Sequence, residues 1–496
     1  DQVKLYGGYT RWYHELGEAA ADGAGLRYAA AVGARAAAAA RSAPRGPVHL
    51  NVPLREPLGP AAAPPAIATP APPRFASADP RPDPAAVAEL AARIAAEPRG
   101  LVVAGRPALN AAARAAVARL AAAAGYPVLA EPLSGLRFGV DAGADPVIHP
   151  AADTGAAVRA ARRPVWVTGY DALLRPDSGL AVPPPRLVLR IGGSLTWKHV
   201  SDYLGRADAA WQVAIDPERS WDDPTGRVGL RIEAPVAATL DAVADALAAR
   251  GAGVDDAGAG WRAGWRAASE AVAGVRASFV AAPDGEAARS TAWLHAALVE
   301  LLPEGALLAV ANSMAVRDLD TFGAPGAKAL HVVGNRGAAG IDGTLSSALG
   351  AAFGSGRPAA LLTGDLAFLH DAGGFGPVAD LVARHGAATL DLFVVIVDDG
   401  GGGIFEHLPV AAADRRRFET FFATPQAADL AALCRAWGVP CRAAPDPAAL
   451  AAAAAVPAPI RAAVVPIDRA ANTAAHRAYW RAAAAAAAAA TAGRAW

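Results

Sequence analysis

The chain has 496 residues, about three times the length of a typical domain, so we expect about three domains with cores of their own. Its 46 basic and 46 acidic residues give a formal net charge of zero, without the basic stripe that follows a nucleic acid backbone. These counts argue against a small binding module and against nucleic acid as a partner.

Cysteine usage and hydropathy indicate the cellular compartment. Cys434 and Cys441 lack the spacing of a zinc site or a disulfide framework, which favours a reducing environment. The longest apolar run, Ala482–Ala490, is less than half of the ~20 residues that a membrane-spanning helix needs. We therefore expect a cytoplasmic protein without a membrane anchor.

The first predicted elements are a helix over 23–41 and a short buried strand over 47–53 that a proline ends. They predict that residues 1–58 are the C-terminal remnant of an α/β domain. Residues 59–84 are rich in Pro and Ala, which predicts an extended linker.

Strand and helix patterns then alternate over residues 85–250. Helices are expected at 84–96 and 110–124, and strands at 101–104, 127–129, 164–168, 186–190 and 212–215. This alternation predicts a central α/β domain, in which a parallel sheet is covered by helices on both faces.

The rest of the chain repeats this alternation. A connecting segment over 251–285 contains a predicted helix at 261–281, and strands are expected at 306–311, 359–363 and 392–397 within a third α/β domain over 286–470. Residues 471–496 form a predicted Ala-rich C-terminal tail. The predicted fold class is thus α/β, with parallel sheets flanked by helices and an incomplete first domain.

Acidic residues follow two of the strands predicted in the third domain. Asp365 comes directly after 359–363, and Asp399 precedes the glycine run 400–403. The carboxyl ends of parallel strands meet at one edge of a sheet, where such folds bind ligands. Oxygen ligands suit Mg²⁺ held chiefly through phosphates, and glycines let backbone N–H groups approach a diphosphate. Either segment alone also fits a helix cap or a mobile loop, but both in this order predict a metal-diphosphate site.

The two acidic segments resemble the metal and diphosphate motif of thiamine-diphosphate enzymes. Further segments at 45–58, 312–318, 334–343 and 468–472 resemble the 2-succinyl-5-enolpyruvyl-6-hydroxy-3-cyclohexene-1-carboxylate synthase family of menaquinone biosynthesis. The resemblance covers essentially the whole chain. It implies the three-domain architecture of thiamine-diphosphate enzymes.

The resemblance implies thiamine diphosphate and Mg²⁺ (or Mn²⁺) as cofactors. It assigns the metal to Asp365, Asp399 and the carbonyl of Gly401. The implied cofactor-binding residues are Gly364, Asp365, Leu366, Ile341, Gly401, Gly402, Ile404 and Phe405. Ile341 matches the apolar residue that holds the cofactor in its bent shape. Without the resemblance, an ordinary isoleucine of the core is the simpler interpretation.

The chain departs from the family pattern at two points. Asp399 stands where Asn is commoner, and its added negative charge is expected to raise the affinity for metal and to lower that for the cofactor. The segment between the two acidic motifs is also long, which predicts a longer surface loop near 384–388.

The resemblance implies a transferase that decarboxylates 2-oxoglutarate and adds the succinyl carbanion to isochorismate in a 1,4-addition. Both substrates are dicarboxylates, which suit guanidinium forks. The implied substrate-binding residues are Ser313, Arg317, Arg336, Lys198, His199 and Leu408. For any single arginine, a solvated surface charge is the simpler interpretation.

Family members use an upstream glutamate to activate the cofactor, at a position before the segment that matches 1–7. We therefore expect that the sequence is an N-terminally truncated record, that it is inactive as printed, and that the enzyme is a homodimer or a dimer of dimers. Two alternatives stay open: another thiamine-diphosphate decarboxylase or carboligase, and a non-catalytic paralogue.

Overall fold

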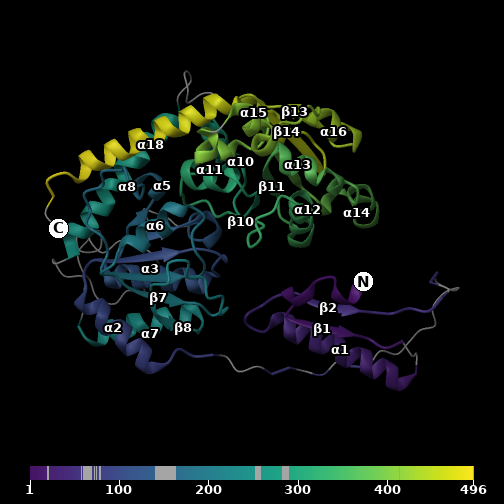
Figure 1. Cartoon of the computed structure of the whole chain (residues 1–496), viewed down its shortest axis with the longest axis horizontal. Helices are drawn as coiled ribbons and strands as arrows, with labels where there is room; N and C mark the ends of the chain where they lie inside the picture. The colour runs from purple at the N-terminus through teal and green to yellow at the C-terminus, as the bar shows by residue number, and fades with distance from the viewer. Residues whose placement is uncertain are drawn as a thin grey trace. The chain divides into compact units, whose positions relative to one another are not determined.

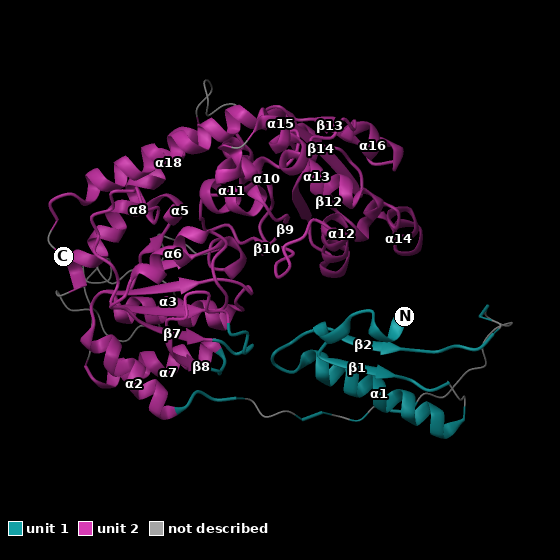
Figure 2. Cartoon of the chain, viewed as in Figure 1, with its two compact units in different colours: residues 1–83, 216–221, 232–235 teal, residues 84–215, 222–231, 236–496 magenta. Residues whose placement is uncertain are grey.

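The computed structural model describes residues 1–18, 22–56, 58–59, 70–71, 73, 75–76, 80–139, 164–251, 258–281, 290–412, 414–494 and 496. The chain divides into two compact units (Figure 2). Unit 1 comprises Asp1–Asp83, Asp216–Trp221 and Ile232–Pro235, and unit 2 comprises Pro84–Ile215, Asp222–Arg231 and Val236–Trp496.

Unit 1 is built around a two-stranded parallel sheet. Strand β1 (Trp12–Glu15) pairs with β2 (Val48–Asn51), and helix α1 (Gly23–Arg41) forms the crossover that a parallel pair requires. The carboxylate of Asp22 caps α1 by accepting a hydrogen bond from the backbone N–H of Gly25 at 2.7 Å. The helix predicted at 23–41 and the strand within 47–53 are confirmed.

Unit 2 contains two six-stranded parallel sheets. The first has the order β5-β4-β3-β6-β7-β8. Its strands are β3 (Gly100–Ala104), β4 (Val128–Ala130), β5 (Trp166–Val167), β6 (Leu187–Ile191), β7 (Trp211–Ile215) and β8 (Val228–Ile232). The helices in this part of the chain are α2 (Pro84–Ala96), α3 (Ala111–Ala124), α5 (Tyr170–Leu173), α6 (Lys198–Arg206), α7 (Val236–Ala249) and α8 (Ala259–Val280).

Alternating side chains of the first sheet give it a buried face on each side, as parallel sheets require. Leu101 and Val103 of β3 point into a core that also holds Trp261 and Trp265 of α8. Helix α7 packs against both α2 and α3 beside the same sheet (Figure 1).

The second sheet has the order β10-β9-β11-β12-β14-β13. Its strands are β9 (Leu307–Val310), β10 (His331–Val333), β11 (Ala359–Gly364), β12 (Leu392–Asp398), β13 (Cys441–Ala443) and β14 (Ile460–Pro466). Its helices are α10 (Ala292–Leu301), α11 (Met314–Phe322), α12 (Thr344–Ser355), α13 (Asp365–His370), α14 (Val378–His385), α15 (Arg415–Phe418), α16 (Leu430–Ala436) and α17 (Pro447–Ala454).

The two faces of the second sheet bury different residues of the same strands. Leu362 and Val395 lie in a core with α10, α11 and α17, whereas Leu361 and Val394 lie in a core with α12, α13 and α16. A helical layer on each face of a parallel sheet confirms the α/β fold class.

The predicted Ala-rich tail forms helix α18 (Arg469–Thr491). Figure 1 shows it running beside α8, and the two helices share an extensive contact. Ala483 and Ala487 are fully buried in the first sheet's core, since methyl side chains let two helices approach closely.

One predicted loop is wrong. The extra length near 384–388 is helical, because α14 continues to His385 and a 3₁₀ turn follows at Ala387–Thr389. The exposed ion pair between Asp380 and Arg384, four residues apart, suits a solvent-facing helix.

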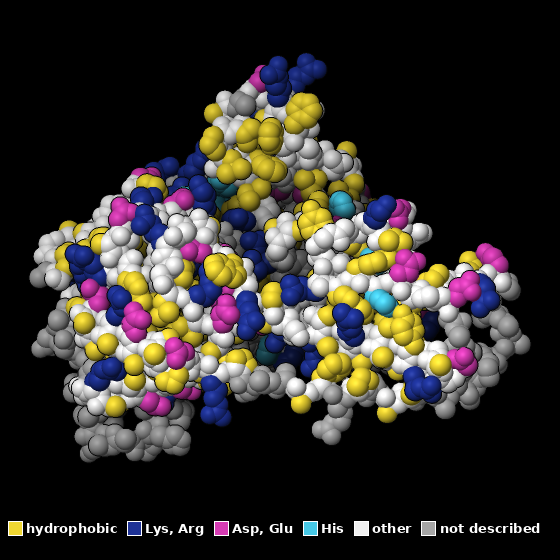
Figure 3. All heavy atoms as spheres, turned by 60° about the horizontal axis from the view of Figure 1, so that its bottom comes forward, with side chains coloured by type: hydrophobic (Ala, Val, Ile, Leu, Met, Phe, Trp, Pro, Cys, Tyr) yellow, Lys and Arg dark blue, Asp and Glu magenta, His cyan; other side chains and the backbone are white. Residues whose placement is uncertain are grey.

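Basic and acidic side chains are interspersed over the face of the molecule in Figure 3. Within the described ranges, none of the helices combines the length and the apolar character that crossing a membrane requires.

Candidate active site

The carboxyl ends of β11 and β12 position two acidic side chains at one edge of the second sheet. The strands are parallel neighbours in which Gly364 pairs with Val397, so both end at the same level. Asp365 begins α13 directly after β11, and Asp399 directly follows β12. The sheet register therefore brings both predicted metal ligands to one edge.

Asp365 ties the end of β11 to the glycine segment. Its side-chain Oδ2 accepts a hydrogen bond from the backbone N–H of Gly401 at 2.7 Å, and its Oδ1 accepts one from Leu366 at 2.6 Å. Burial raises the pKa of Asp365 to about 6 despite these hydrogen bonds, and the charge of Asp398 acts in the same direction.

Asp399 is the more perturbed of the two acids. Burial and then the charge of Asp365 raise the pKa of Asp399 to about 8. Two carboxylates in a site of low dielectric repel each other, and a cation between them removes that repulsion. The donor chemistry of this pair thus fits a divalent metal.

Side chains alone do not complete a metal site here. In the part of the chain that the structure describes, no group of three or more His, Cys, Asp or Glu side chains could hold a metal ion. The predicted set combines two carboxylates with a backbone carbonyl, which suits an ion that takes its other ligands from phosphate and water.

Close packing leaves no room for a side chain at two positions of the glycine run, Gly401 and Gly403. A Cβ atom at Gly403 would lie 2.2 Å from Oδ2 of Asp399. Gly401 has a φ of +120°, and a Cβ there would lie 2.0 Å from the carbonyl oxygen of Ala423. Side chains at these positions would displace the acid and the loop, so the segment forms a cradle that only glycine allows.

A cavity of about 60 Å³ lies at this edge of the sheet. It brings together the predicted residues Ser313, Gly364, Asp399, Gly401 and Ile404. Its full lining is Thr291, His295, Asn312, Ser313, Met314, Ala315, Asp318, Gly364, Val397, Asp399, Gly401, Gly403, Ile404 and Asn472.

Ser313 stands before the first turn of α11, at the edge of this cavity. Its φ of +66° lies in the left-handed region, which is strained for a residue other than glycine. Strain of this kind persists where surrounding structure enforces it and is concentrated at functional sites. The backbone N–H groups of the α11 N-terminus favour an anionic group in the cavity.

A buried hydrogen-bond network forms the floor of the cavity. His476 Nε2 and Asp318 Oδ1 are 2.8 Å apart, and the hydroxyl of Thr291 donates to Asp318 Oδ2 at 2.8 Å. Asn472 accepts a hydrogen bond from the backbone N–H of Thr291 at 3.1 Å. Burial disfavours both charges, but their mutual attraction outweighs it, raising the pKa of His476 and lowering that of Asp318. They form a buried ion pair.

Burial lowers the pKa of both Arg317 and Arg336. The positive charge of Arg336 lowers the pKa of Arg317 further, although burial is the larger cause. Arg317 donates to the backbone oxygen of Ser313 at 2.6 Å, and Arg336 donates to the side-chain oxygen of Asn312 at 2.6 Å. Each guanidinium is thereby oriented, with further N–H groups left for a ligand.

Glu131 supplies a third charge beside these arginines. It is fully buried and accepts hydrogen bonds from the backbone N–H groups of Arg106 and Thr196 at 3.0 and 2.9 Å. Burial raises the pKa of Glu131, while Arg336 opposes that shift. The charge of Glu131 in turn favours the charged forms of Arg317 and Arg336.

The segment that carries Lys198 and His199 lies close to Arg317. The guanidinium of Arg317 is 5.8 Å from the ring of Trp197, on which His199 stacks. Burial lowers the pKa of His199, and its Nε2 is 3.2 Å from Nη1 of Arg175. Lys198 is largely exposed and 3.6 Å from Asp202.

Other predicted residues lie outside the cavity lining. Ile341 and Leu408 are 38% and 47% exposed, and the ring of Phe405 packs edge-on against Phe422. Leu366 follows Asp365 in α13, and the backbone N–H of Gly402 donates to Ala423 at 2.8 Å. Their assigned roles stay predictions.

The residues that sequence reasoning missed are Glu131, Thr291, His295, Asp318 and His476. Glu131 directly follows β4, so the rule that selected Asp365 would have found it. The other four become neighbours only when α10, α11 and α18 converge, and no local spacing signals that.

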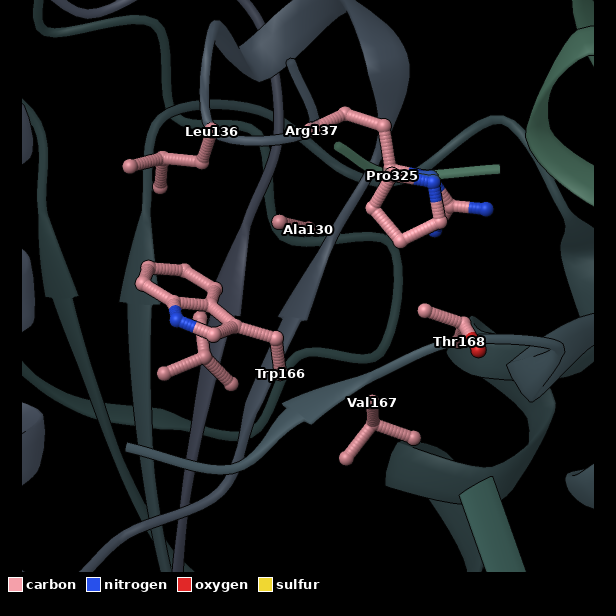
Figure 4. A pocket seen from close by; sticks show the side chains of 8 residues that line it. Ala130, Leu136, Arg137, Trp166, Val167, Thr168 and Pro325 are labelled. Carbon is pink, nitrogen blue, oxygen red and sulfur yellow. The ribbon is translucent and has the colours of Figure 1, made fainter. Parts of the chain in front are cut away.

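A smaller cavity of about 20 Å³ lies beside β4 and β5 (Figure 4). Arg137, Trp166 and Thr168 carry its polar side-chain atoms, and the rest of its lining is apolar. This volume suits about one water molecule and not a substrate.

Curated proteins named 2-succinyl-5-enolpyruvyl-6-hydroxy-3-cyclohexene-1-carboxylate synthase are similar to the chain. The protein of Myxococcus xanthus is 38% identical over an aligned length of 449 positions, and the alignment covers 86% of this chain and 68% of that protein. The protein of Roseiflexus castenholzii is 34% identical, over 88% of this chain and 71% of that protein. No family model matches the chain.

Solved structures share its fold. A Mycobacterium smegmatis protein described as thiamin diphosphate-dependent matches with a TM-score of 0.59 and 18% identity, over 94% of this chain and 78% of that protein. Benzoylformate decarboxylase of Polynucleobacter necessarius matches with a TM-score of 0.57 and 18% identity, over 94% and 77%.

Proposed function

The chain belongs to the 2-succinyl-5-enolpyruvyl-6-hydroxy-3-cyclohexene-1-carboxylate synthase family, and from that premise we propose its reaction. It decarboxylates 2-oxoglutarate and joins the remaining succinyl unit to isochorismate by 1,4-addition, in menaquinone biosynthesis. The proposal rests mainly on one observation: Asp365, Asp399 and the glycine run lie together at the carboxyl ends of the parallel strands β11 and β12.

Thiamine diphosphate and Mg²⁺ are the proposed cofactors. Asp365, Asp399 and the carbonyl of Gly401 hold the metal, whose charge offsets the repulsion that raises the pKa of both acids. Gly403 leaves the space beside Asp399 that a diphosphate needs. When bound, thiamine diphosphate supplies the nucleophilic carbon and the electron sink for decarboxylation.

The chain's own residues bind and orient the two dicarboxylates. Arg317 and Arg336 are the proposed carboxylate clamps, because both are desolvated and held in place by backbone or side-chain oxygens. Ser313 adds a hydroxyl donor, and from the central region Lys198 adds a positive charge and His199 a ring nitrogen. Holding the two reactants close together and correctly oriented lowers the entropic part of the activation barrier.

Further assignments accompany this proposal. Ile341 supports the bent cofactor, and Phe405 and Leu408 form the apolar side of the substrate pocket. The domain boundaries are those expected from the sequence, and the enzyme is at least a dimer.

The test of the reaction uses protein purified from the source organism. With thiamine diphosphate and Mg²⁺, we expect CO₂ release from 2-oxoglutarate and an adduct that forms only when isochorismate is present. Pyruvate in place of 2-oxoglutarate is the control for another thiamine-diphosphate carboligase, and turnover of pyruvate alone would contradict the assignment. Cofactor binding without CO₂ release would indicate a non-catalytic paralogue.

A further inference from the structure

A second, larger cavity lies between α18 and the segment that follows α5, and none of the residues assigned to the active site lines it. Its volume is about 390 Å³, within the range of about 300–1,000 Å³ that small-molecule sites occupy. The lining residues are Arg175, Asp177, Ser178, Arg477, Trp480, Arg481, Ala484 and Ala485.

The wall of this cavity carries three guanidinium groups and one carboxylate. Asp177 is mostly exposed and no closer than 3.9 Å to Arg175. Arg477 donates to the backbone oxygen of Glu406 at 2.8 Å. Among the described residues, neither Arg477 nor Arg481 forms an ion pair, so the cavity has an excess of positive charge.

Arg477 and Arg481 are four residues apart on α18 and therefore project from the same face, one turn apart. Like charges in this relation destabilise a helix unless a counter-charge lies between them. The cavity places space for such a counter-charge directly beside both side chains.

The third arginine and the aromatic wall are held in place. The guanidinium of Arg175 lies 4.2 Å from the ring centre of Trp480, and its Nη1 is 3.2 Å from Nε2 of His199. The indole N–H of Trp480 donates to Asp171 at 3.0 Å. Burial lowers the pKa of Arg175, which marks a cation that has already lost part of its hydration.

We propose that this cavity is a binding site for a small multivalent oxyanion, carrying two or more carboxylate or phosphate groups. Three guanidinium groups can each form paired hydrogen bonds to such groups. Their three positive charges exceed the single negative charge of Asp177. None of the residues that line this cavity is assigned to the cofactor or substrate site, although Arg175 contacts His199 of the proposed substrate site.

Calorimetric titration of the full chain tests the site without thiamine diphosphate or metal. Citrate is the carboxylate probe and inorganic diphosphate is the phosphate probe, each at ionic strength matched with sodium chloride. We expect saturable binding of at least one probe, and the tighter probe identifies the anion class. Because Arg175 lies over Trp480, binding is also expected to change the tryptophan fluorescence.

Two sets of variants locate the binding. The double variant Arg477→Gln/Arg481→Gln is expected to weaken binding by about tenfold or more for each arginine removed, since paired charge-assisted hydrogen bonds are lost. Trp480→Phe is expected to retain binding and to lose the fluorescence change. Arg494→Gln, an exposed arginine just beyond α18, is the matched control and should bind as the wild type does.

Three results would overturn the proposal. They are the absence of saturable binding of both probes up to about 10 mM, equal binding by the double variant, and an equal response to sodium chloride alone. Diphosphate that binds in the cofactor cavity instead would give the second result, because that cavity does not contain Arg477 or Arg481.

Discussion

At the residue scale, Asp399 has the largest consequence for the proposed site. Its carboxylate is forced beside that of Asp365, and burial raises the pKa of both acids. Without a cation, the ionised forms of the two acids therefore destabilise each other. Metal binding and the stability of the metal-free chain should depend on this residue in opposite directions.

Replacing Asp399 with Asn tests that opposition. At about pH 7 we expect the unfolding free energy of the metal-free chain to rise by about 1–3 kcal/mol, because Asn replaces an acid whose ionisation the folded site disfavours. The Mg²⁺ concentration for half-saturation should rise about tenfold, since an amide oxygen carries no charge. Urea unfolding and metal titration measure the two effects.

Asp380→Asn is the control for this variant, because Asp380 is an exposed acid of α14 in the same part of the chain. It should change neither quantity appreciably. A less stable metal-free Asp399→Asn chain would show that the two acids do not repel each other.

The buried pair of His476 and Asp318 makes stability depend on pH. His476 has a folded-state pKa raised above its unfolded value, so its contribution is complete below about pH 6.5 and is lost as pH rises through the folded pKa. Asp318 has a lowered pKa, so its contribution is complete above about pH 4 and is lost as pH falls through the folded value.

We therefore expect the stability difference between the wild type and His476→Gln to be largest between about pH 4 and 6.5 and to shrink at higher pH. Urea unfolding of both proteins from pH 5 to 9 measures it. A difference that stays constant over this range would mean that the imidazole is neutral in the folded chain.

At the element scale, the glycine run after β12 is held in place by contacts to two other elements, α13 and α18. The N–H of Gly401 binds Asp365, and Arg469, at the start of α18, donates to the carbonyl of Gly400 at 2.8 Å. The glycine run is thus fixed from both sides. Its backbone is a defined cradle, which the sequence left open as a possible mobile loop.

Gly403→Ala should disrupt that cradle. The added methyl group would overlap Oδ2 of Asp399, so we expect a loss of about 1–3 kcal/mol in stability and a markedly weaker affinity for thiamine diphosphate. Gly350→Ala is the matched control, because a Cβ at this exposed position of α12 meets no atom within 4 Å. That variant should gain about 0.5–1 kcal/mol. Equal cofactor affinity in both variants would contradict the assignment of Gly403.

The elements that sequence reasoning placed well are those with strong local signals. Helix 23–41 and the strand at 359–363 lie within a residue of their observed bounds, since alanine propensity and unbroken apolar runs act locally. The short strand β10 escaped prediction because two of its three residues are exposed. The helical end of α14 was interpreted as a loop because its polar face resembles one.

At the scale of the whole molecule, the two sheets of unit 2 are joined by buried polar contacts. Arg137, next to the first sheet, donates to the backbone of Asp320 in α11, and Tyr170 of α5 donates to the carboxylate of Asp320. Arg137 and Asp320 are 2% and 4% exposed. Burial raises the pKa of Asp320 to about 7 although Arg137 opposes the shift.

Arg137→Leu should therefore be costly. Removing one partner of a buried pair lowers stability by about 3–5 kcal/mol, because the remaining polar groups lose their partner. Arg384→Gln breaks an exposed pair and is expected to cost less than about 1 kcal/mol. Urea unfolding compares them, and similar losses in the two variants would show that Arg137 does not hold the sheets together.

The most direct measurement is a calorimetric titration of the chain with thiamine diphosphate, in Mg²⁺ and in EDTA. We expect saturable binding in Mg²⁺ that EDTA abolishes and that Asp365→Asn weakens at least about tenfold, whereas Asp380→Asn should bind normally. Binding that ignores both EDTA and Asp365→Asn would contradict a metal-diphosphate site at the ends of β11 and β12.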